Sequence, residues 1–185
     1  MHDPFLEETG VSNETSAMRE TIRSALQQRQ NKVYSRDEVG NERDGFRSEL
    51  RKLVSVAARR YTQPVSDADH QAAIRGISET LSAEFSSILK DRRLRYGTAQ
   101  KAFNLYLKFL WRLGRIAIPP HCPVDGIVLK AGDIKGKWTH SDSEAEYTDW
   151  IKILRQKANP RSLAEWEYQL WSATEKPKSK RGSCR

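Results

Sequence analysis

The chain has 185 residues, 30% of them charged, and a formal net charge of +8 at pH 7. That length suits one domain with a substantial core. The charge density and the absence of any run of about 18 apolar residues exclude a membrane-spanning protein. The first residues lack the pattern of a signal peptide, and two cysteines, Cys122 and Cys184, do not make a disulfide framework. We therefore expect a cytoplasmic protein with no membrane partner.

The N-terminal region, residues 1–45, is predicted to contain one helix and a flexible linker. Residues 1 to about 12 show no helical pattern and are expected to be disordered. Ser12-Asn13-Glu14 can begin a helix that carries apolar residues at helical spacing as far as Leu26. The polar stretch from Gln27 to Gly45 is predicted to be the linker.

A helical core domain is predicted for residues 46–174. Apolar residues from Phe46 to Tyr61 lie on one helix face, and Pro64 ends that helix. Ser66-Asp67 begins the next helix, whose apolar stripe is expected to extend through Phe85 to Ile88.

The middle of the core is predicted to be a turn and a helix. A break at Arg95-Tyr96-Gly97 precedes a helix from about Ala99 to Leu113. The inward face of this helix is apolar, and its polar stripe consists of Lys101, Asn104, Lys108 and Arg112.

The C-terminal part is predicted to be two further helices after an extended loop. Three prolines between Pro119 and Pro123 exclude helix there, and Ile127–Leu129 is either a short helix or a strand. Ser141–Glu144 and Ser162–Glu165 each have the pattern of a capping box. Residues 175–185 are expected to be a disordered basic tail. The fold class is therefore all-α, a single compact domain of about six helices.

The positive charge is concentrated in the middle of the chain. Between Lys90 and Arg115, eight basic residues stand against one acid, Asp91. A local excess of this kind is the footprint of a phosphate-binding surface. Nucleic acid is therefore the expected partner, DNA in preference to RNA. The alternative is a solvated helix face that acids elsewhere in the fold balance.

A glycine turn opens the helix in this basic segment. The turn at Gly97 and Thr98 would point unpaired backbone N–H groups outward, which suits a DNA phosphate. The expected nucleic-acid-binding residues lie on and around this turn: Arg92, Arg93, Arg95, Gly97, Thr98, Lys108 and Arg112.

The order of a helix, a glycine turn, a lysine-bearing helix, a proline-rich loop and Pro123-Val124-Asp125 resembles the helix-hairpin-helix DNA glycosylases, especially the 8-oxoguanine type. The resemblance covers about residues 46–174. It implies that Lys101 is a Schiff-base nucleophile, that Asp125 assists departure of the base, and that aromatic residues from Trp138 to Trp171 help to form a base pocket. Ala99 stands where the family has its second hairpin glycine.

Each of these residues also has a structural reading. A lysine on a polar stripe is usually solvated, Asp125 is a good helix cap, and the tryptophans have core spacing. His121, Cys122 and His140 are too few for a metal site, and we expect no metal and no cofactor. Three hypotheses remain open: a DNA N-glycosylase with possible lyase activity, a non-catalytic nucleic-acid-binding module of a mobile element or defence system, and a protein-interaction domain.

Overall fold

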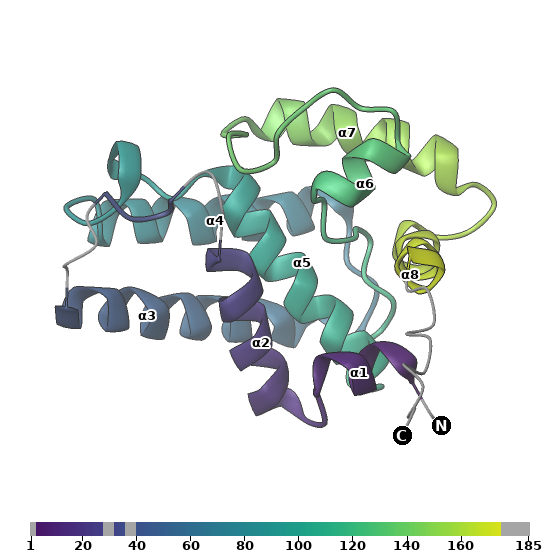
Figure 1. Ribbon diagram of the computed structural model, residues 1–185, viewed down its shortest axis with the longest axis horizontal. Helices are drawn as coiled ribbons and strands as arrows, with labels where there is room; N and C mark the ends of the chain where they lie inside the picture. The colour runs from purple at the N-terminus through teal and green to yellow at the C-terminus, as the bar shows by residue number, and fades with distance from the viewer. Residues whose placement is uncertain (1–2, 28–31, 36–39, 175–185) are drawn as a thin grey trace, which may run out of the picture.

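The computed structural model describes residues 3–27, 32–35 and 40–174, and every regular element within these ranges is helical (Figure 1). The prediction of an all-α fold is confirmed. The α-helices are α1 (Pro4–Thr9), α2 (Glu14–Leu26), α3 (Gly40–Ala58), α4 (Asp67–Glu84), α5 (Tyr96–Arg112), α6 (Gly126–Ala131), α7 (Glu144–Ala158) and α8 (Leu163–Thr174). Short 3₁₀ helices span Arg59–Thr62 and Lys90–Arg92.

Helix α5 lies at the centre of the molecule and contacts α2, α3 and α4 (Figure 1). Ala99 and Ala102 are fully buried, and their small side chains allow neighbouring helices to approach closely. Phe103 and Leu107 fill the core beside them, and burying one such side chain stabilises the fold by about 1.5–3 kcal/mol. The predicted break precedes α5 and includes Arg95, which has an extended backbone, but it ends earlier than predicted because Tyr96 and Gly97 form the first turn of α5.

The N-terminal segment belongs to the same core. Asp3 caps α1, since its carboxylate accepts a hydrogen bond of 3.0 Å from the N–H of Phe5. Phe5 stacks on Phe109 of α5 at a ring-centroid distance of 4.9 Å and meets Trp171 of α8 edge-on at 5.0 Å. The expected disorder of residues 1–12 is therefore wrong from Asp3 onward. A six-residue helix is too short to show a periodic pattern, and distant residues hold it in place.

The predicted linker includes the first turns of a helix. α3 begins at Gly40, within the predicted linker. The residues before Phe46 are polar and lie on the exposed side of the helix, so they show no apolar pattern in the sequence. Val33 is buried, and Tyr34 forms an isolated antiparallel bridge with Leu89. Residues 28–31 and 36–39 lie outside the described residues, as does the predicted tail at 175–185.

Local capping signals set the starts of three helices. The Ser66 hydroxyl accepts from the N–H of Asp69 at 3.1 Å at the start of α4. Ser162 and Glu165 form the predicted reciprocal pair at α8. At α7 the cap is Ser143 rather than Ser141. The helix α4 ends at Glu84, so its apolar stripe does not run on to Ile88 as expected.

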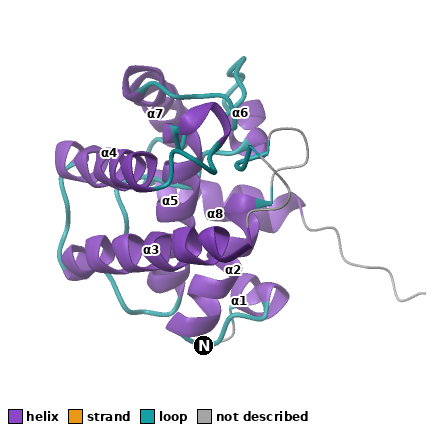
Figure 2. Ribbon diagram, turned by 90° about the vertical axis from the view of Figure 1, so that its left-hand side faces the viewer, coloured by secondary structure: helices purple, strands orange, loops and turns teal. Residues whose placement is uncertain are grey.

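The undecided segment Ile127–Leu129 is helical and forms part of α6. Across the molecule, α7 and α1 lie at opposite ends, with α5 and α8 between them (Figure 2). None of the helices within residues 3–27 and 40–174 combines the length and the apolar composition that a bilayer crossing needs.

Candidate nucleic-acid interface

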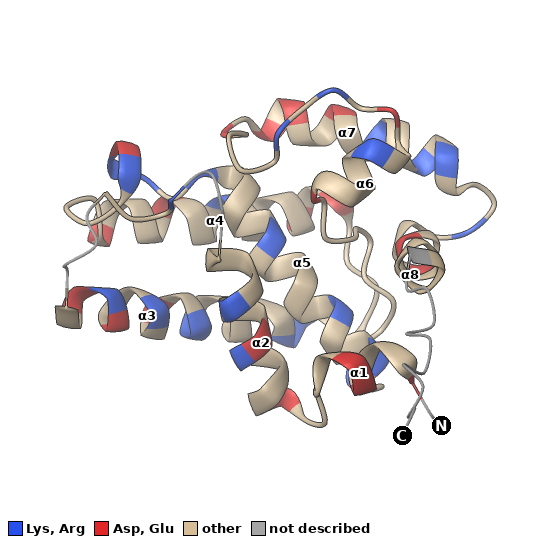
Figure 3. Ribbon diagram, viewed as in Figure 1, with Lys and Arg blue, Asp and Glu red and all other residues tan. Residues whose placement is uncertain are grey.

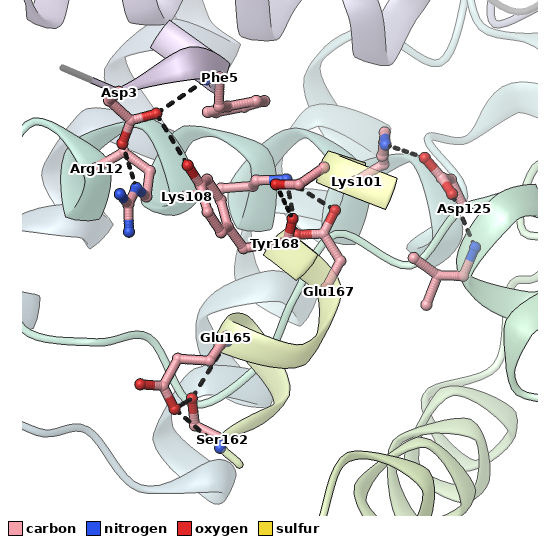
Figure 4. A network of polar contacts seen from close by, with 12 residues as sticks. Asp3, Phe5, Lys101, Lys108, Arg112, Asp125, Ser162, Glu165, Glu167 and Tyr168 are labelled. Atoms are coloured by element: carbon pink, nitrogen blue, oxygen red, sulfur yellow. Dashed lines mark hydrogen bonds and ion pairs between the residues drawn. The ribbon is translucent and has the colours of Figure 1, made fainter. Parts of the chain in front are cut away.

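The polar stripe of α5 points at carboxylates from three other elements (Figure 4). Asn104 and Lys108 are buried, and Lys101 and Arg112 are half-buried, so the expectation that this stripe faces outward is wrong. The three ion pairs are Lys101 with Asp125, Lys108 with Glu167, and Arg112 with Asp3. Acids elsewhere in the fold therefore balance the charges of Lys101, Lys108 and Arg112, as the alternative interpretation of the charge excess expects.

Lys101 and Asp125 come together across 24 residues of sequence. The Lys101 Nζ lies 2.6 Å from Asp125 Oδ2, and the two side chains are 12% and 27% exposed. Asp125 also caps α6 by accepting hydrogen bonds of 3.0 Å and 3.2 Å from the N–H groups of Ile127 and Val128. Burial opposes ionisation of Asp125, but the charge and hydrogen bond of Lys101 hold its pKa below the ordinary value. The pair therefore joins α5 to the start of α6, where Asp125 acts as a helix cap.

Gln100 fixes the backbone next to Asp125. Its amide nitrogen donates to the carbonyl of Val124 at 2.6 Å, and its amide oxygen accepts from the N–H of Val124 at 3.2 Å. Asn104, one turn further along α5, donates to the Tyr147 hydroxyl at 3.0 Å. These buried contacts hold the loop before α6 rigidly against α5.

Lys108 and Glu167 form a second ion pair that is almost enclosed. The Lys108 Nζ lies 2.7 Å from Glu167 Oε2, and the two side chains are 4% and 11% exposed. Burial lowers the pKa of Lys108 and raises the pKa of Glu167, although the partners attract each other. Lys108 was predicted to contact nucleic acid, but its charged end points to α8 and not to solvent.

The backbone at Gly97 and Thr98 is not open to a ligand. The N–H of Gly97 donates to the carbonyl of Ser141 at 2.9 Å, and that of Thr98 to the carbonyl of Arg95 at 3.0 Å. A Cβ at Gly97 would lie 1.8 Å from the carbonyl oxygen of Trp138. The glycine therefore allows close approach of the 138–141 segment, and the expected phosphate seat on these N–H groups is contradicted.

Basic side chains from the segment before α5 and from Lys32 line one pocket. Figure 3 marks the basic positions along the ribbon. Lys32, Lys90, Arg93 and Arg95 line a polar pocket of about 10 Å³, together with the hydroxyl-bearing Thr98 and Thr139. A space of this size admits one water-sized group, such as a phosphate oxygen. We call these four cations the α5 basic cluster.

Carboxylates balance part of this cluster. Arg93 pairs with Asp142 at 2.8 Å, and Arg95 pairs with Asp91. The neighbouring Arg92 is exposed, and it forms no ion pair within the part of the chain that the structure describes.

A second basic surface lies between α2 and α3, where the sequence analysis placed no site. A groove of about 300 Å³ is lined there by Arg19, Arg23, Arg47 and Arg51, and also by apolar side chains. We call it the arginine groove. The two arginines of each helix are four residues apart and so share a face. That spacing was visible in the sequence, but the packing of α2 against α3 was not.

Comparison of the chain with protein-family models, curated proteins and solved structures gave no match. Within the described residues, no group of three or more His, Cys, Asp and Glu side chains is arranged to hold a metal ion. Function is therefore argued from the site geometry alone.

Proposed function

We propose that this protein is a nucleic-acid-binding helical protein that contacts the phosphate backbone, of DNA in preference to RNA. The observation that carries the proposal is the α5 basic cluster, where Lys32, Lys90, Arg93 and Arg95 come from two separate segments to line one pocket. Guanidinium and ammonium groups are the usual ligands of phosphate, and their attraction extends beyond contact distance. The pairing of Arg93 with Asp142 and of Arg95 with Asp91 weakens this attraction.

The test is equilibrium binding of a fluorescently labelled DNA duplex to the full chain, followed by anisotropy. Arg92→Gln combined with Arg93→Gln removes one member of the α5 basic cluster and its exposed neighbour, and should weaken binding by about tenfold. Arg59→Gln combined with Lys52→Gln removes the same charge elsewhere and should change the dissociation constant by less than about twofold. Equal effects of the two double variants would contradict a site at the α5 basic cluster.

A second candidate function is DNA N-glycosylase chemistry, and the 2.6 Å approach of Lys101 to Asp125 favours it. In that reaction the lysine nitrogen bonds to the sugar C1′ as the bond from C1′ to the base breaks. The amine must first lose its proton, and the departing base takes one up. A lysine nucleophile of this kind needs a partly dry site, and Lys101 is largely shielded from solvent.

Borohydride trapping separates this candidate from binding alone. Borohydride reduces a lysine Schiff base to a stable amine, so a catalytic Lys101 would leave a covalent adduct with a damaged-base duplex. The adduct should disappear in Lys101→Gln, while Lys130→Gln on nearby α6 should retain it. Absence of any adduct with wild-type protein across damaged bases would remove the lysine mechanism and leave the binding proposal intact.

A further inference from the structure

The arginine groove is distinct from the α5 basic cluster and has its own chemistry. We propose that it binds single-stranded nucleic acid, with phosphates along the arginines and bases against the groove floor. This inference rests on the proposed function, because it assumes a nucleic-acid partner. It adds a second contact surface, and it specifies that the nucleic acid bound there is single-stranded.

The groove is lined by arginines without any acid. Its eight lining residues include Arg19, Arg23, Arg47 and Arg51 and no carboxylate. Arg19 and Arg51 are exposed and form no ion pair within the described part of the chain. Such unpaired guanidinium groups can bind phosphate oxygens in pairs.

The other two arginines have acidic partners outside the groove lining. Arg23 contacts Glu20 at 2.5 Å, whereas Arg47 lies 3.4 Å from Asp44, which is 78% exposed. The Arg23–Glu20 contact is bidentate and Glu20 is only 16% exposed, so it neutralises most of the charge of Arg23. The exposed Arg47–Asp44 contact contributes little and competes poorly with a polyanion. The groove therefore retains an excess of positive charge.

The floor of the groove is apolar, which favours a single strand over a duplex. Ile22 and Leu26 of α2 and Tyr34 lie between the two rows of arginines. Phe46 meets the Tyr34 ring edge-on at a centroid distance of 5.5 Å, and the guanidinium of Arg43 lies over the ring at 4.7 Å, so a base at Tyr34 would meet an aromatic and a guanidinium surface together. A duplex presents mainly phosphates at its surface and would leave this floor unused. An unpaired base can lie on apolar, aromatic and guanidinium surfaces.

The arginine groove and the α5 basic cluster adjoin the same short segment. Tyr34 lines the groove, and Lys32 and Val33 line the pocket of the cluster. One strand can therefore pass from the groove to the cluster over residues 32–35. Figure 3 marks the basic positions along the ribbons of α2, α3 and the segment before α5.

The test compares a labelled single-stranded oligodeoxynucleotide with the same strand annealed to its complement, using the full chain. Wild-type protein should bind the single strand at least about fivefold more tightly. Arg47→Ala combined with Arg51→Ala should weaken single-strand binding by about tenfold and reduce the salt slope of log K by about 1.4, the value for two lost contacts. Circular dichroism should show the same melting temperature as wild type.

The matched control is Arg59→Ala combined with Lys52→Ala, which removes the same charge outside the groove. It should leave single-strand affinity within about twofold of wild type. Equal losses in both double variants, or a duplex bound as tightly as the single strand, would overturn the inference. Loss of binding only in the Arg92→Gln, Arg93→Gln variant would overturn the groove and keep the proposed function. No binding by wild-type protein would overturn both.

Discussion

At the scale of single residues, burial determines what each charged group can do. Lys108 and Glu167 are enclosed between α5 and α8. Burial removes hydration, so it lowers the pKa of Lys108 and raises the pKa of Glu167, which favours the neutral form of each. Lys101 and Asp125 are less enclosed, and there the pKa of the carboxyl is lowered. The first pair is suited to holding helices together. The second pair is 12% and 27% exposed and so retains some access to solvent.

Breaking the enclosed pair should be costly. Lys108→Met leaves the Glu167 carboxyl buried without a counter-charge, so unfolding free energy should fall by about 3–5 kcal/mol. Lys108→Met combined with Glu167→Leu should be within about 1 kcal/mol of wild type, because neither charge remains. Urea denaturation followed by circular dichroism measures both. A double variant as unstable as the single variant would contradict an electrostatic cause.

Two buried histidines should make stability depend on pH. His70 lies 2.7 Å from the Tyr61 hydroxyl, and His121 contacts Tyr147 and Asp67. Burial lowers the pKa of both imidazoles below 6.5, most strongly at His70, where the nearby His121 adds to the effect.

The unfolded chain therefore binds protons more readily than the folded chain as the pH falls below about 6.5, and stability is lost in that range. The melting temperature should be lower at about pH 5 than at pH 7.5, and His70→Gln should reduce the difference. His140→Gln, which changes an exposed residue, is the control and should leave the difference as in wild type. An unchanged pH dependence in His70→Gln would show that His70 does not cause it.

At the scale of elements, short-range signals were readable from the sequence and long-range pairings were not. Ser66 and Ser162 act as caps where the sequence predicts them, because a cap needs only residues within one turn. The partner of Arg112 is Asp3, 109 residues away, and no local pattern indicates it. Arg92–Arg95 were correctly identified as part of a basic region, but the arginine groove depends on how α2 packs against α3.

Gly97 shows how one element is positioned by a distant one. A side chain there would meet the Trp138 carbonyl at 1.8 Å, so Gly97→Ala must push α5 away from the 138–141 segment. The variant should lose about 1–3 kcal/mol of stability in urea unfolding. Gly76→Ala on α4 meets nothing within 4 Å and should gain about 1 kcal/mol. A neutral Gly97→Ala would contradict the close packing described for this turn.

At the scale of the whole molecule, the N-terminal segment and the helical core are one folding unit. α1 packs against α5 and α8: Asp3 pairs with Arg112 of α5, and Phe5 contacts Phe109 of α5 and Trp171 of α8. The apolar residues near the N-terminus find their partners far along the chain, as Phe5 does with Phe109 and Trp171. Exposed basic residues occur on α2, α3 and the segment before α5, and also on α4, α6 and α7.

Phe5→Ala tests this integration. It removes a buried ring that touches α5 and α8, so the free energy of unfolding should fall by about 3–5 kcal/mol in a single transition. Leu6→Ala changes a partly buried neighbour and should cost less. An unaffected transition midpoint in Phe5→Ala would mean that α1 folds apart from the core.

The central claim is that this fold presents a phosphate-binding surface. The most direct measurement is the affinity of wild-type protein for a labelled oligodeoxynucleotide across a series of salt concentrations. Contact with the four arginines of the groove predicts a linear plot of log K against log salt with a slope of about −3. Absence of binding at about 50 mM salt, or an affinity that does not change between about 50 and 200 mM, would contradict the claim.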